Sequence, residues 1–525
     1  MIDRDPNGEK RIQIHAPGCF ESFPIAKSSI QRRVGGGDFV IRRKVLSVGI
    51  LLILSWAAAI PALAQSGAAA PTGGSGSSGQ PAAPGQSQSP YAGSVPGKLV
   101  PGVLDISLQD ALARGLKQNL GALLSNEDIR AAHGQRWKQL SALLPNATSS
   151  TYINDSQVNL AEFGFNFKFP GVSIPTIVGP FAYYDTRAYL TQSVFDWKAI
   201  NNSRSSVQSV KSAEYTYKDA RDLVILAVGY AYLQAIADEA RIETSDAQVK
   251  TAQALYDQSS DQVKAGTSPA IDGLRAQVEL KTRQQQLIQS KNDFAIQKLT
   301  LARVIGLAPG QEFELTDKSL YQPFAGITVE EALKRAYTSR SDYQAALADV
   351  RAAEYSRKAA EAGYYPSLNF SADYGLAGNY PTTVTHGVFD VRGTLTIPIF
   401  QGGKVKGDVL QASATLEQAR EKAENLQAQI DTDVRTALFN LQSSQELVDV
   451  AKSNIDLAEQ TLAQSRDRFG AGVTDTVEVV QAEEAVASAH EQYISSLYSF
   501  NYAKIALARA LGVAEEGVKE YFKGK

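Results

Sequence analysis

The longest regular pattern of apolar positions runs from Lys404 to Gly470, a stretch without proline. Apolar or small residues recur there at every seventh position, with a second row three residues further on. The first row is Val409, Leu416, Ala423, Ile430 and Ala437, and the second is Ala412, Ala419 and Leu426. This spacing predicts a coiled-coil helix, about 100 Å long if it is continuous. The second row breaks at Asp433, where the repeat requires an apolar residue.

The same pattern occurs twice in the chain. Residues 301–307 match residues 507–513, and the matches continue upstream of both segments. Self-similarity of this kind indicates two copies of one structural unit. We place the first repeat at 105–326 and the second at 327–513, interleaved in one elongated body. The first copy is longer, with the extra residues near 163–180.

Each repeat opens with two shorter helices. Ser107 with Asp110, and Thr328 with Glu331, have the spacing of a capping box at a helix start. The second helix of each pair ends before Pro145 or Pro366.

After these prolines the period of the apolar positions changes from that of a helix to two, which is typical of a strand. In the second copy the strands span 368–374 and 389–399, with a turn at 379–381; in the first copy a fainter pair spans 147–162 and 181–195. The apolar face of these hairpins either covers a soluble core or faces lipid. A sheet in lipid must close on itself. Four strands are too few, so about three chains would have to pool about twelve strands.

Two tight turns join the long helices to returning helices. The first long helix is predicted from Lys198 to Lys264. The turns contain Gly266, Thr267 and Ser268 in the first copy, and Gly472, Val473 and Thr474 in the second. Ser268 and Thr474 are predicted to cap the returning helices, with Pro269 at the first helical position.

Each returning helix carries a carboxylate in its first turns, Asp272 in the first copy and Glu478 in the second. One interpretation is stabilisation by the helix dipole. The other is a ring of carboxylates where the turns of several chains meet.

The amino-terminal region has the pattern of a secretory signal. Arg42, Arg43 and Lys44 precede an apolar run, and Ala64 precedes Gln65 at a small-residue cleavage site. An uncleaved anchor helix is the alternative. We assign residues 1–64 to this region, with translation starting near Val40. The only cysteine, Cys19, precedes the site, so neither a lipoprotein anchor nor a disulfide is expected.

The segments that flank the repeats are predicted to be simple. Residues 65–104 include a long run rich in Gly, Pro, Ser, Ala and Gln, which predicts a flexible tether. Residues 514–525 form a carboxy-terminal tail. The chain has a formal net charge of −3 and no basic stripe, so nucleic acid is not an expected partner. No histidine, cysteine or serine pattern indicates a catalytic centre, a metal site or a cofactor.

With these features the chain resembles the TolC-type outer-membrane efflux family from Asp105 to Val513. The resemblance rests on the duplicated helix–hairpin–long helix plan, on the two turns, and on the Leu-Ala-Arg endings at 301–303 and 507–509. Its most specific piece is the strand-to-helix junction Leu395–Gly403.

The resemblance implies a mostly α fold with a β-barrel part. Three chains would form an outer-membrane β-barrel of about twelve strands, continued by an α-helical coiled-coil barrel in the periplasm. It also implies a periplasmic membrane-fusion adaptor docked at the turns named above, and an inner-membrane pump of the RND or ABC type. Asp272 and Glu478 fall on positions that line the periplasmic entrance.

The chain departs from some family members at three of these positions. Arg275 and Gln481 stand where a second inward acid occurs, and Thr474 stands where arginine occurs. The expected function is a passive exit duct, for efflux or type I secretion, whose cargo is chosen by the pump. A structural coiled coil of the cell envelope that forms no channel is the alternative, and an enzyme is the most distant one.

Overall fold

The helices follow the predicted duplication. The first repeat contains α1 (Leu108–Gln118), α2 (Leu120–Ser141), α3 (Trp197–Lys264) and α4 (Ala270–Ile305). The second contains α5 (Val329–Ser339), α6 (Ser341–Glu361), α7 (Lys404–Gly470) and α8 (Thr476–Ala510), and α9 (Ala514–Tyr521) follows. The stretch of heptads is therefore one helix, α7, with the predicted ends.

The computed structural model describes residues 90–164, 168–169, 171–173, 175–317, 323–324, 326–380 and 385–521. The predicted signal segment with Ala64 and Gln65, the start near Val40, and residues 65–89 of the predicted tether lie outside these residues. So does Pro381 of the predicted strand turn. All described residues belong to one unit of the chain, Pro84–Lys525.

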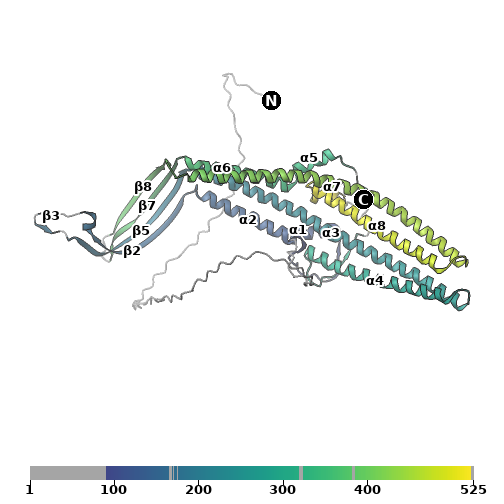
Figure 1. The fold of residues 1–525 in the computed structure, drawn as a ribbon. Coiled ribbons are helices and arrows are strands. Elements are labelled where there is room, and N and C mark those ends of the chain that lie inside the picture. Colours follow the sequence, from purple (N-terminus) through teal and green to yellow (C-terminus); the bar gives the residue numbers. More distant parts are fainter. Residues whose placement is uncertain are drawn as a thin grey trace, which may run out of the picture. The chain divides into compact units, whose positions relative to one another are not determined.

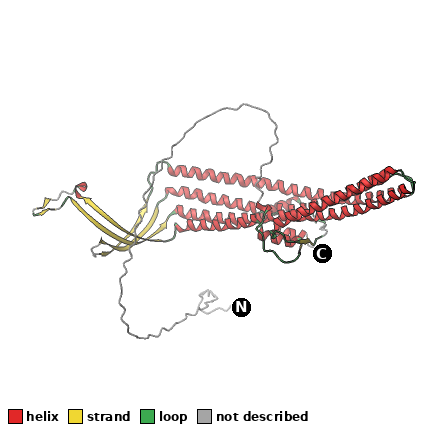
Figure 2. Cartoon of the chain, turned by 90° about the horizontal axis from the view of Figure 1, so that it is seen from below, coloured by secondary structure: helices red, strands yellow, loops and turns green. Residues whose placement is uncertain are grey.

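Within this unit the helices pack side by side, with a sheet at one end and two helical turns at the other (Figures 1 and 2). Helix α3 contacts α2, α4, α6 and α8, and α7 contacts α6 and α8. Near the sheet the order of neighbours is therefore α2, α3, α6, α7. Toward the turns it is α4, α3, α8, α7, so that α7 lies at one edge of the layer throughout.

The predicted helix starts at Ser107 and Thr328 are confirmed. The Ser107 hydroxyl accepts from the Asp110 backbone N–H at 3.2 Å, and the Asp110 carboxylate accepts from the Ser107 N–H at 3.3 Å. Both halves of a capping box are thus present in α1. In α5 the Thr328 hydroxyl accepts from the Glu331 N–H at 3.3 Å, which is the first half of the same arrangement.

The heptad seam of α7 is buried, but its second row shifts halfway along. Leu416, Ala423, Ile430 and Ala437 of the first row are buried. From Ile430 onward the second buried row is Val434, Leu441 and Val448, one residue later than the row predicted through Asp433. Asp433 consequently lies outside the seam, where its carboxylate accepts from the Arg340 guanidinium at 2.9 Å.

A four-stranded antiparallel sheet joins the two repeats. Its order is β2 (Asn146–Asn159), β5 (Ile177–Phe195), β7 (Ser367–Tyr380) and β8 (Thr385–Thr396). Both predicted hairpins are therefore confirmed, and β5 pairs with β7 across the boundary between the repeats. The predicted end of the last strand, Ile399, is wrong, because β8 ends before Pro398, which has no N–H for a ladder. The first-repeat insertion contains η2 (Leu160–Phe163), β3 (Lys168–Phe169) and β4 (Val172–Ser173).

Each repeat has a buried core midway along the helices, at matching positions of the two copies. The first core gathers β1 (Leu104–Ile106), β6 (Phe313–Leu315) and residues of α1, α3, α4, α8 and α9; the second gathers α5, α7 and α8. Ala514 and Val518 of α9 are buried in the first core. The predicted carboxy-terminal tail is therefore part of the packed structure as far as these residues.

The segment that precedes β1 also packs on the first core. The Gly97 N–H donates to the Gly306 carbonyl at 2.8 Å, and the Val95 N–H donates to the Gln118 carbonyl at 2.9 Å. Residues 90–92 form the short helix η1. Packed structure thus begins earlier in the chain than the tether boundary predicted at residue 104.

Of the described helices, α3 alone has an 18-residue window apolar enough to cross a membrane, with a mean hydropathy of 1.4. However, 56% of this window is buried inside the protein. Val224, Val228 and Tyr232 belong to the first core. The apolar window of α3 is therefore explained by packing against neighbouring helices.

Candidate functional site

One face of the four-stranded sheet is apolar and exposed. Because successive side chains of a strand point to opposite faces, the register places Tyr374 and Phe389 on the same face, as it does Leu368 and Leu395. Phe389 is 76% exposed and Tyr374 is 67% exposed. Large apolar surface on this scale requires a partner such as lipid or another protein.

The opposite face of the sheet is polar and charged. It carries Asp185 and Arg187 of β5, Asp373 of β7, and Asp390 and Arg392 of β8. The Arg187 guanidinium donates to the Asp185 carboxylate at 2.9 Å and to the Asp373 carboxylate at 2.8 Å. The sheet is thus two-faced, as a wall between lipid and water would be.

Both edges of this sheet are open. Among the described strands, β2 pairs only with β5 and β8 pairs only with β7. The two edge strands have 14 and 12 residues, so the unpaired edges are similar in length. An exposed pair of edges is a template for pairing with other chains.

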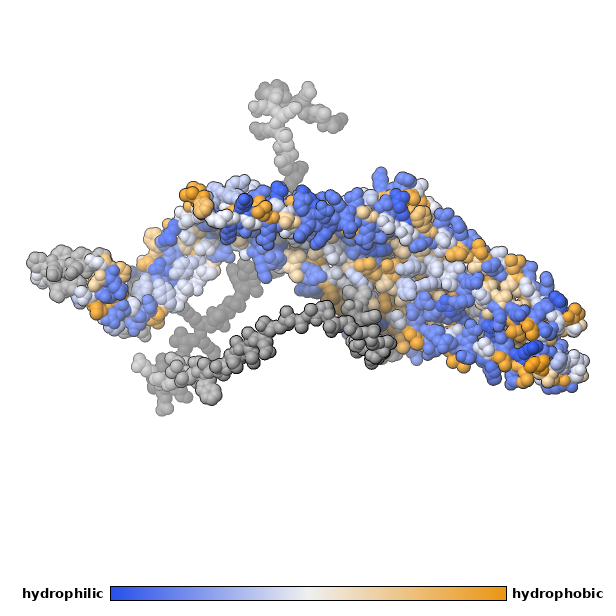
Figure 3. Space-filling model, in the orientation of Figure 1, coloured by the Kyte–Doolittle hydropathy of each residue, from blue (hydrophilic) through white to orange (hydrophobic). Residues whose placement is uncertain are grey.

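The helical layer also has two edges that expose apolar stripes. On α4 the exposed residues share one side of the helix: Ile271, Leu274, Val278, Ile288, Ile296 and Leu299. On α7 the equivalent stripe contains Phe439, Leu447, Val450 and Leu457. Figure 3 shows hydrophobic side chains scattered among hydrophilic ones over the visible face of the helices. The edges α4 and α7 are thus suited to contact another copy of the layer.

The two helical turns have the same backbone structure. After α3, the Gly266 N–H donates to the Val263 carbonyl at 3.1 Å and the Thr267 N–H to the Gln262 carbonyl at 3.0 Å. This pair of bonds is a Schellman motif. Gly266 has a φ of +73° and Gly472 a φ of +72°, so both turns need the left-handed conformation that glycine favours.

In the second turn, the Gly472 N–H donates to the Phe469 carbonyl and the Val473 N–H to the Arg468 carbonyl, both at 3.0 Å. Val473 is 69% exposed. The second turn therefore repeats the hydrogen bonds of the first and adds an exposed apolar side chain.

The predicted caps of the returning helices are each displaced by one residue. The N-cap of α4 is Pro269, not Ser268, and it makes no side-chain bond. The N-cap of α8 is Asp475, not Thr474; its carboxylate accepts from the Val477 N–H at 3.1 Å. A carboxylate at the next position gives a stronger cap than the threonine hydroxyl.

The Ser268 and Thr474 hydroxyls bond the two predicted carboxylates instead. The Ser268 hydroxyl donates to Asp272 at 2.8 Å, and the Thr474 hydroxyl donates to Glu478. The equivalence of the two copies thus includes a hydroxyl–carboxylate pair. Within one chain, this hydrogen bond holds each carboxylate close to the turn that precedes its helix.

The surroundings of these two carboxylates differ. Asp272 is 6% exposed and lies 3.4 Å from the Arg275 guanidinium. Glu478 is more exposed and lies 3.1 Å from Arg468. Gln481 is exposed on α8. The structure therefore brings Asp272 and Arg275 together and places Glu478 beside Arg468, which the sequence analysis did not name.

The two helical hairpins, α3–α4 and α7–α8, pack against each other close to their turns. Leu255 of α3, Ala276 of α4, Phe469 of α7 and Val479 of α8 form one buried cluster. Beyond it, Glu483 is 5% exposed and accepts from Arg466 at 3.2 Å. Burial raises the pKa of Glu483, while Arg466 opposes this rise.

A groove of about 430 Å³ lies where these hairpins meet, with Glu243, Arg283, Glu459 and His490 in its lining. The His490 imidazole lies 3.4 Å from the Glu459 carboxylate. The groove is a polar seam between two elements that belong to different repeats.

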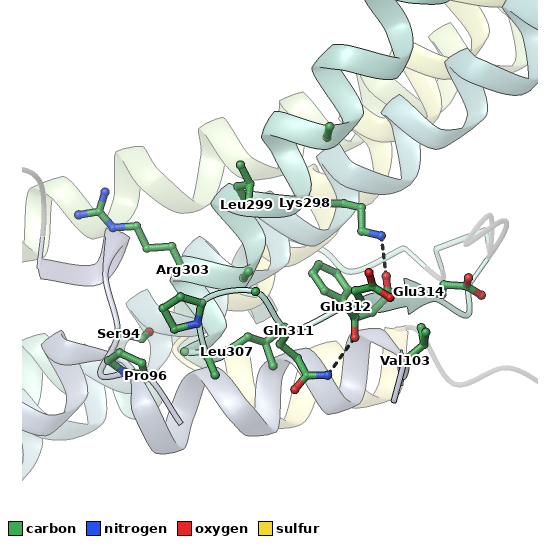
Figure 4. Close-up of a pocket in the computed structure, with 17 residues that line it drawn as sticks. Ser94, Pro96, Val103, Lys298, Leu299, Arg303, Leu307, Gln311, Glu312 and Glu314 are labelled. Carbon is green, nitrogen blue, oxygen red and sulfur yellow. Dashed lines mark hydrogen bonds between the residues drawn. The ribbon is translucent and has the colours of Figure 1, made fainter. Parts of the chain in front are cut away.

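A second cavity, of about 600 Å³, lies beside the first core (Figure 4). The Lys298 ammonium donates to the Phe313 carbonyl at 2.6 Å, and the Gln311 amide donates to the Glu312 carbonyl at 3.1 Å. Both donors are therefore already hydrogen-bonded within the protein, as is typical of a gap left by packing.

The sequence analysis missed a buried charge network midway along the helices. Arg340 donates to Asp342 at 2.7 Å and to Asp433 at 2.9 Å, and Arg509 donates to Asp219. Arg509 belongs to the duplicated Leu-Ala-Arg motif, which was the available signal. The network ties α3, α6, α7 and α8 together.

Near this network, Asp222 of α3 is 8% exposed. Burial raises the pKa of Asp222 to about 6, and Arg509 partly opposes this rise. Among the residues that the structure describes, no group of three or more His, Cys, Asp or Glu side chains could hold a metal ion.

Comparisons with known proteins agree with this arrangement. The chain matches the family described as "Outer membrane efflux protein" over residues 182–307 and 332–513. It is 24% identical over 351 residues to the outer membrane protein TolC of Escherichia coli strain K12, a match that covers 62% of this chain and 69% of that protein. It is 21% identical over 346 residues to the alkaline protease secretion protein AprF of Pseudomonas aeruginosa, covering 63% and 70%.

A solved structure, that of the outer membrane protein VceC of Vibrio cholerae, resembles the chain with a TM-score of 0.65 at 17% identity. The likeness covers 77% of this chain and 96% of that one. The two proteins therefore share a fold.

Proposed function

The chain belongs to the family of outer membrane efflux proteins, and from this membership we propose that it is the passive exit duct of a tripartite efflux or type I secretion system. It resides in the outer membrane, with its helical part in the periplasm. The observation that carries the proposal is the two-faced sheet with open edges at the end of long paired helices. Transport through such a duct needs no catalytic step.

Three copies of the chain close the sheet into a barrel of about twelve strands. The order β2-β5-β7-β8 is antiparallel throughout, so β8 of one copy meets β2 of the next in the antiparallel sense. Closure removes both edges, as a membrane requires. The face that carries Phe389 and Tyr374 then contacts lipid, and the face that carries Asp373 lines the lumen.

Aromatic side chains at the junctions between strands and helices support this position of the membrane. Phe195 ends β5 and Trp197 begins α3, Tyr365 precedes β7, and Phe400 follows β8. Phe400 is 88% exposed and Tyr365 is 54% exposed. Aromatic girdles of this kind lie at the lipid–water interface of outer-membrane barrels. They mark the periplasmic rim of the proposed barrel.

The three-fold rotation that closes the sheet also closes the helical part into a ring. The stripe on α4 of one copy faces the stripe on α7 of the next, which covers apolar surface that a single chain exposes. This arrangement forms a hollow coiled-coil barrel below the membrane. The homotrimer therefore explains the edges of the sheet and those of the helices together.

The turns form the periplasmic entrance and the surface on which a membrane-fusion adaptor docks. Gly266, Thr267, Ser268, Gly472, Val473 and Thr474 make up this surface. Asp272 and Glu478, with Arg275 and Gln481 further along the same helices, face the entrance when neighbouring hairpins meet. The exposed Val473 supplies an apolar contact for the adaptor.

The adaptor connects the duct to an inner-membrane pump of the RND or ABC type, which selects the cargo. Outer-membrane lipid is the remaining partner, and nucleic acid is not one. The signal segment at 1–64 and the two repeats at 105–326 and 327–513 belong to the same proposal.

Electron microscopy and electrical recording of the purified full chain test this function. We expect a hollow cylinder with three-fold symmetry and discrete single-channel currents in planar bilayers. A solid rod that carries no current would overturn the duct and favour a structural coiled coil of the cell envelope.

A further inference from the structure

The polar face of the sheet carries its five charged side chains close together. They are Asp185, Arg187, Asp373, Asp390 and Arg392. The register places them in four successive rows of this face, which span about 20 Å along the strands. We name this group the charged belt.

Two carboxylates of the belt oppose each other directly. Asp373 of β7 is paired in register with Asp390 of β8. Like charges in this position destabilise a sheet. Each carboxylate has one arginine: Arg187 lies 2.8 Å from Asp373, and Arg392 lies 2.9 Å from Asp390. A sheet selected for stability alone would avoid the opposed acids.

The Arg187 side chain lies flat along the wall of the sheet. It crosses Gly375, where an added Cβ would lie 2.6 Å from the Arg187 Cγ and 2.1 Å from the Thr186 carbonyl oxygen. The missing side chain at Gly375 therefore leaves the space through which Arg187 reaches from Asp185 to Asp373. Arg187 is a positioning residue that joins the two repeats and keeps its charge out of the lumen.

The remaining pair extends from the wall. The Asp390 and Arg392 side chains are 48% and 67% exposed, compared with 1% for Asp185 and 11% for Asp373. The belt has three carboxylates and two guanidinium groups, so its net charge is −1 in each chain at neutral pH. A ring of three copies repeats these charges around the lumen, over the same four rows of the strands.

We propose that the charged belt is a charge-selecting zone inside the barrel, separate from the periplasmic entrance, and that it favours small cations over anions. This inference rests on the trimeric barrel of the proposed function. Asp390 and Arg392 are the specificity-determining residues, because they reach the lumen. Asp185, Arg187 and Asp373 hold the wall on which they stand.

The test is the reversal potential of single channels under a KCl gradient. Asp390→Asn brings the belt to zero net charge, and Arg392→Gln brings it to −2 in each chain. For an ion about 10 Å from three such charges in 0.1 M salt, the energies of K⁺ and Cl⁻ shift by similar amounts in opposite senses. Each substitution therefore changes the K⁺/Cl⁻ permeability ratio about fivefold. The ratio falls in the first variant and rises in the second, and both effects grow at lower salt.

Asp155→Asn is the matched control. Asp155 lies on β2 opposite Ala182, on the face directed away from the belt, so the permeability ratio should not change. The double variant Asp272→Asn and Glu478→Gln serves as a second comparison, because it removes two carboxylates at the entrance and leaves the belt unchanged. Opposite shifts in the two belt variants cannot arise from general damage to the fold.

The outcomes separate this inference from the function on which it rests. If the wild-type protein carries no current, the proposed duct fails. If it conducts, but both belt variants keep the wild-type ratio while only the entrance variant changes it, the duct stands and the charged belt is overturned.

Discussion

Replacing Asp222 by asparagine should stabilise the helical part of the protein at neutral pH. Asp222 is 8% exposed on α3, and burial raises the pKa of its carboxyl group to about 6. Arg509 favours the ionised form, whereas Asp219 and Glu515 add repulsion. At pH 7 the folded protein therefore holds an ionised carboxylate in a place that penalises it. Asparagine keeps the shape of the side chain and removes the charge.

The size of the effect follows from the difference between the two pKa values. A rise from 3.8 to about 6 corresponds to about 3 kcal/mol, at about 1.4 kcal/mol for each pH unit. Between these two pH values the unfolded chain has lost the proton that the folded chain still binds. Stability contributed by Asp222 therefore falls as the pH rises from 3.8 to about 6, and it stays constant above that. The advantage of the variant appears in the same window.

Unfolding of the wild type and of Asp222→Asn, followed by far-ultraviolet circular dichroism from pH 4 to pH 8, measures this difference. We expect the two proteins to be equal near pH 4 and the variant to be more stable at pH 7. Asp449→Asn, at an exposed position of α7, is the control and should show no such pH dependence. A variant that is less stable than the wild type at pH 7 would refute the reasoning, because Asp222 would then be a net stabilising partner of Arg509.

Three further predictions concern the turns and the charge network. Gly472→Ala should cost about 1 kcal/mol of stability, since its φ of +72° is unfavourable for alanine; thermal unfolding measures this, and an unchanged midpoint contradicts it. Arg340→Ala should cost about 3–5 kcal/mol, because it leaves two carboxylates without their buried cation. Denaturant unfolding checks the loss, with Arg435→Ala, which breaks an exposed pair, as the nearly silent control. Replacing Asp272 and Glu478 together by alanine should alter single-channel conductance or its block by cations. An unchanged current would reduce both residues to a local structural role.

The sequence predicted the long helices well because their pattern is local and repeated. The ends of α7 at Lys404 and Gly470 were predicted correctly, since glycines lie at both ends. The caps of α4 and α8 were each placed one residue early. In α8 the reason is physical: Asp475 competes with Thr474 for the same backbone donors, and a carboxylate is the stronger acceptor.

Features that depend on distant parts of the chain could not be predicted. Residues 95–97 lack an apolar period, and they are held by backbone bonds to Gln118 and Gly306. Similarly, the partners of Arg340 include Asp433 on another helix. In the sequence, Asp433 was recognisable only as a polar residue at a heptad position that requires an apolar one. In the structure this position coincides with a shift of the buried row to Val434, which frees Asp433 for the charge network.

The duplicated plan links folding of this chain to its assembly. Each repeat supplies one hairpin, and β5 joins β7 to give a sheet that has two faces and two edges. Such a sheet cannot be satisfied alone, because one face is apolar and, among the described strands, β2 and β8 are each paired on one side only. The helical edges α4 and α7 likewise expose apolar stripes that a single chain leaves uncovered. In the proposed trimer, one three-fold rotation would pair the strand edges and cover the apolar stripes together. The polar face would then line the lumen, so the duct would follow from the closure of the edges.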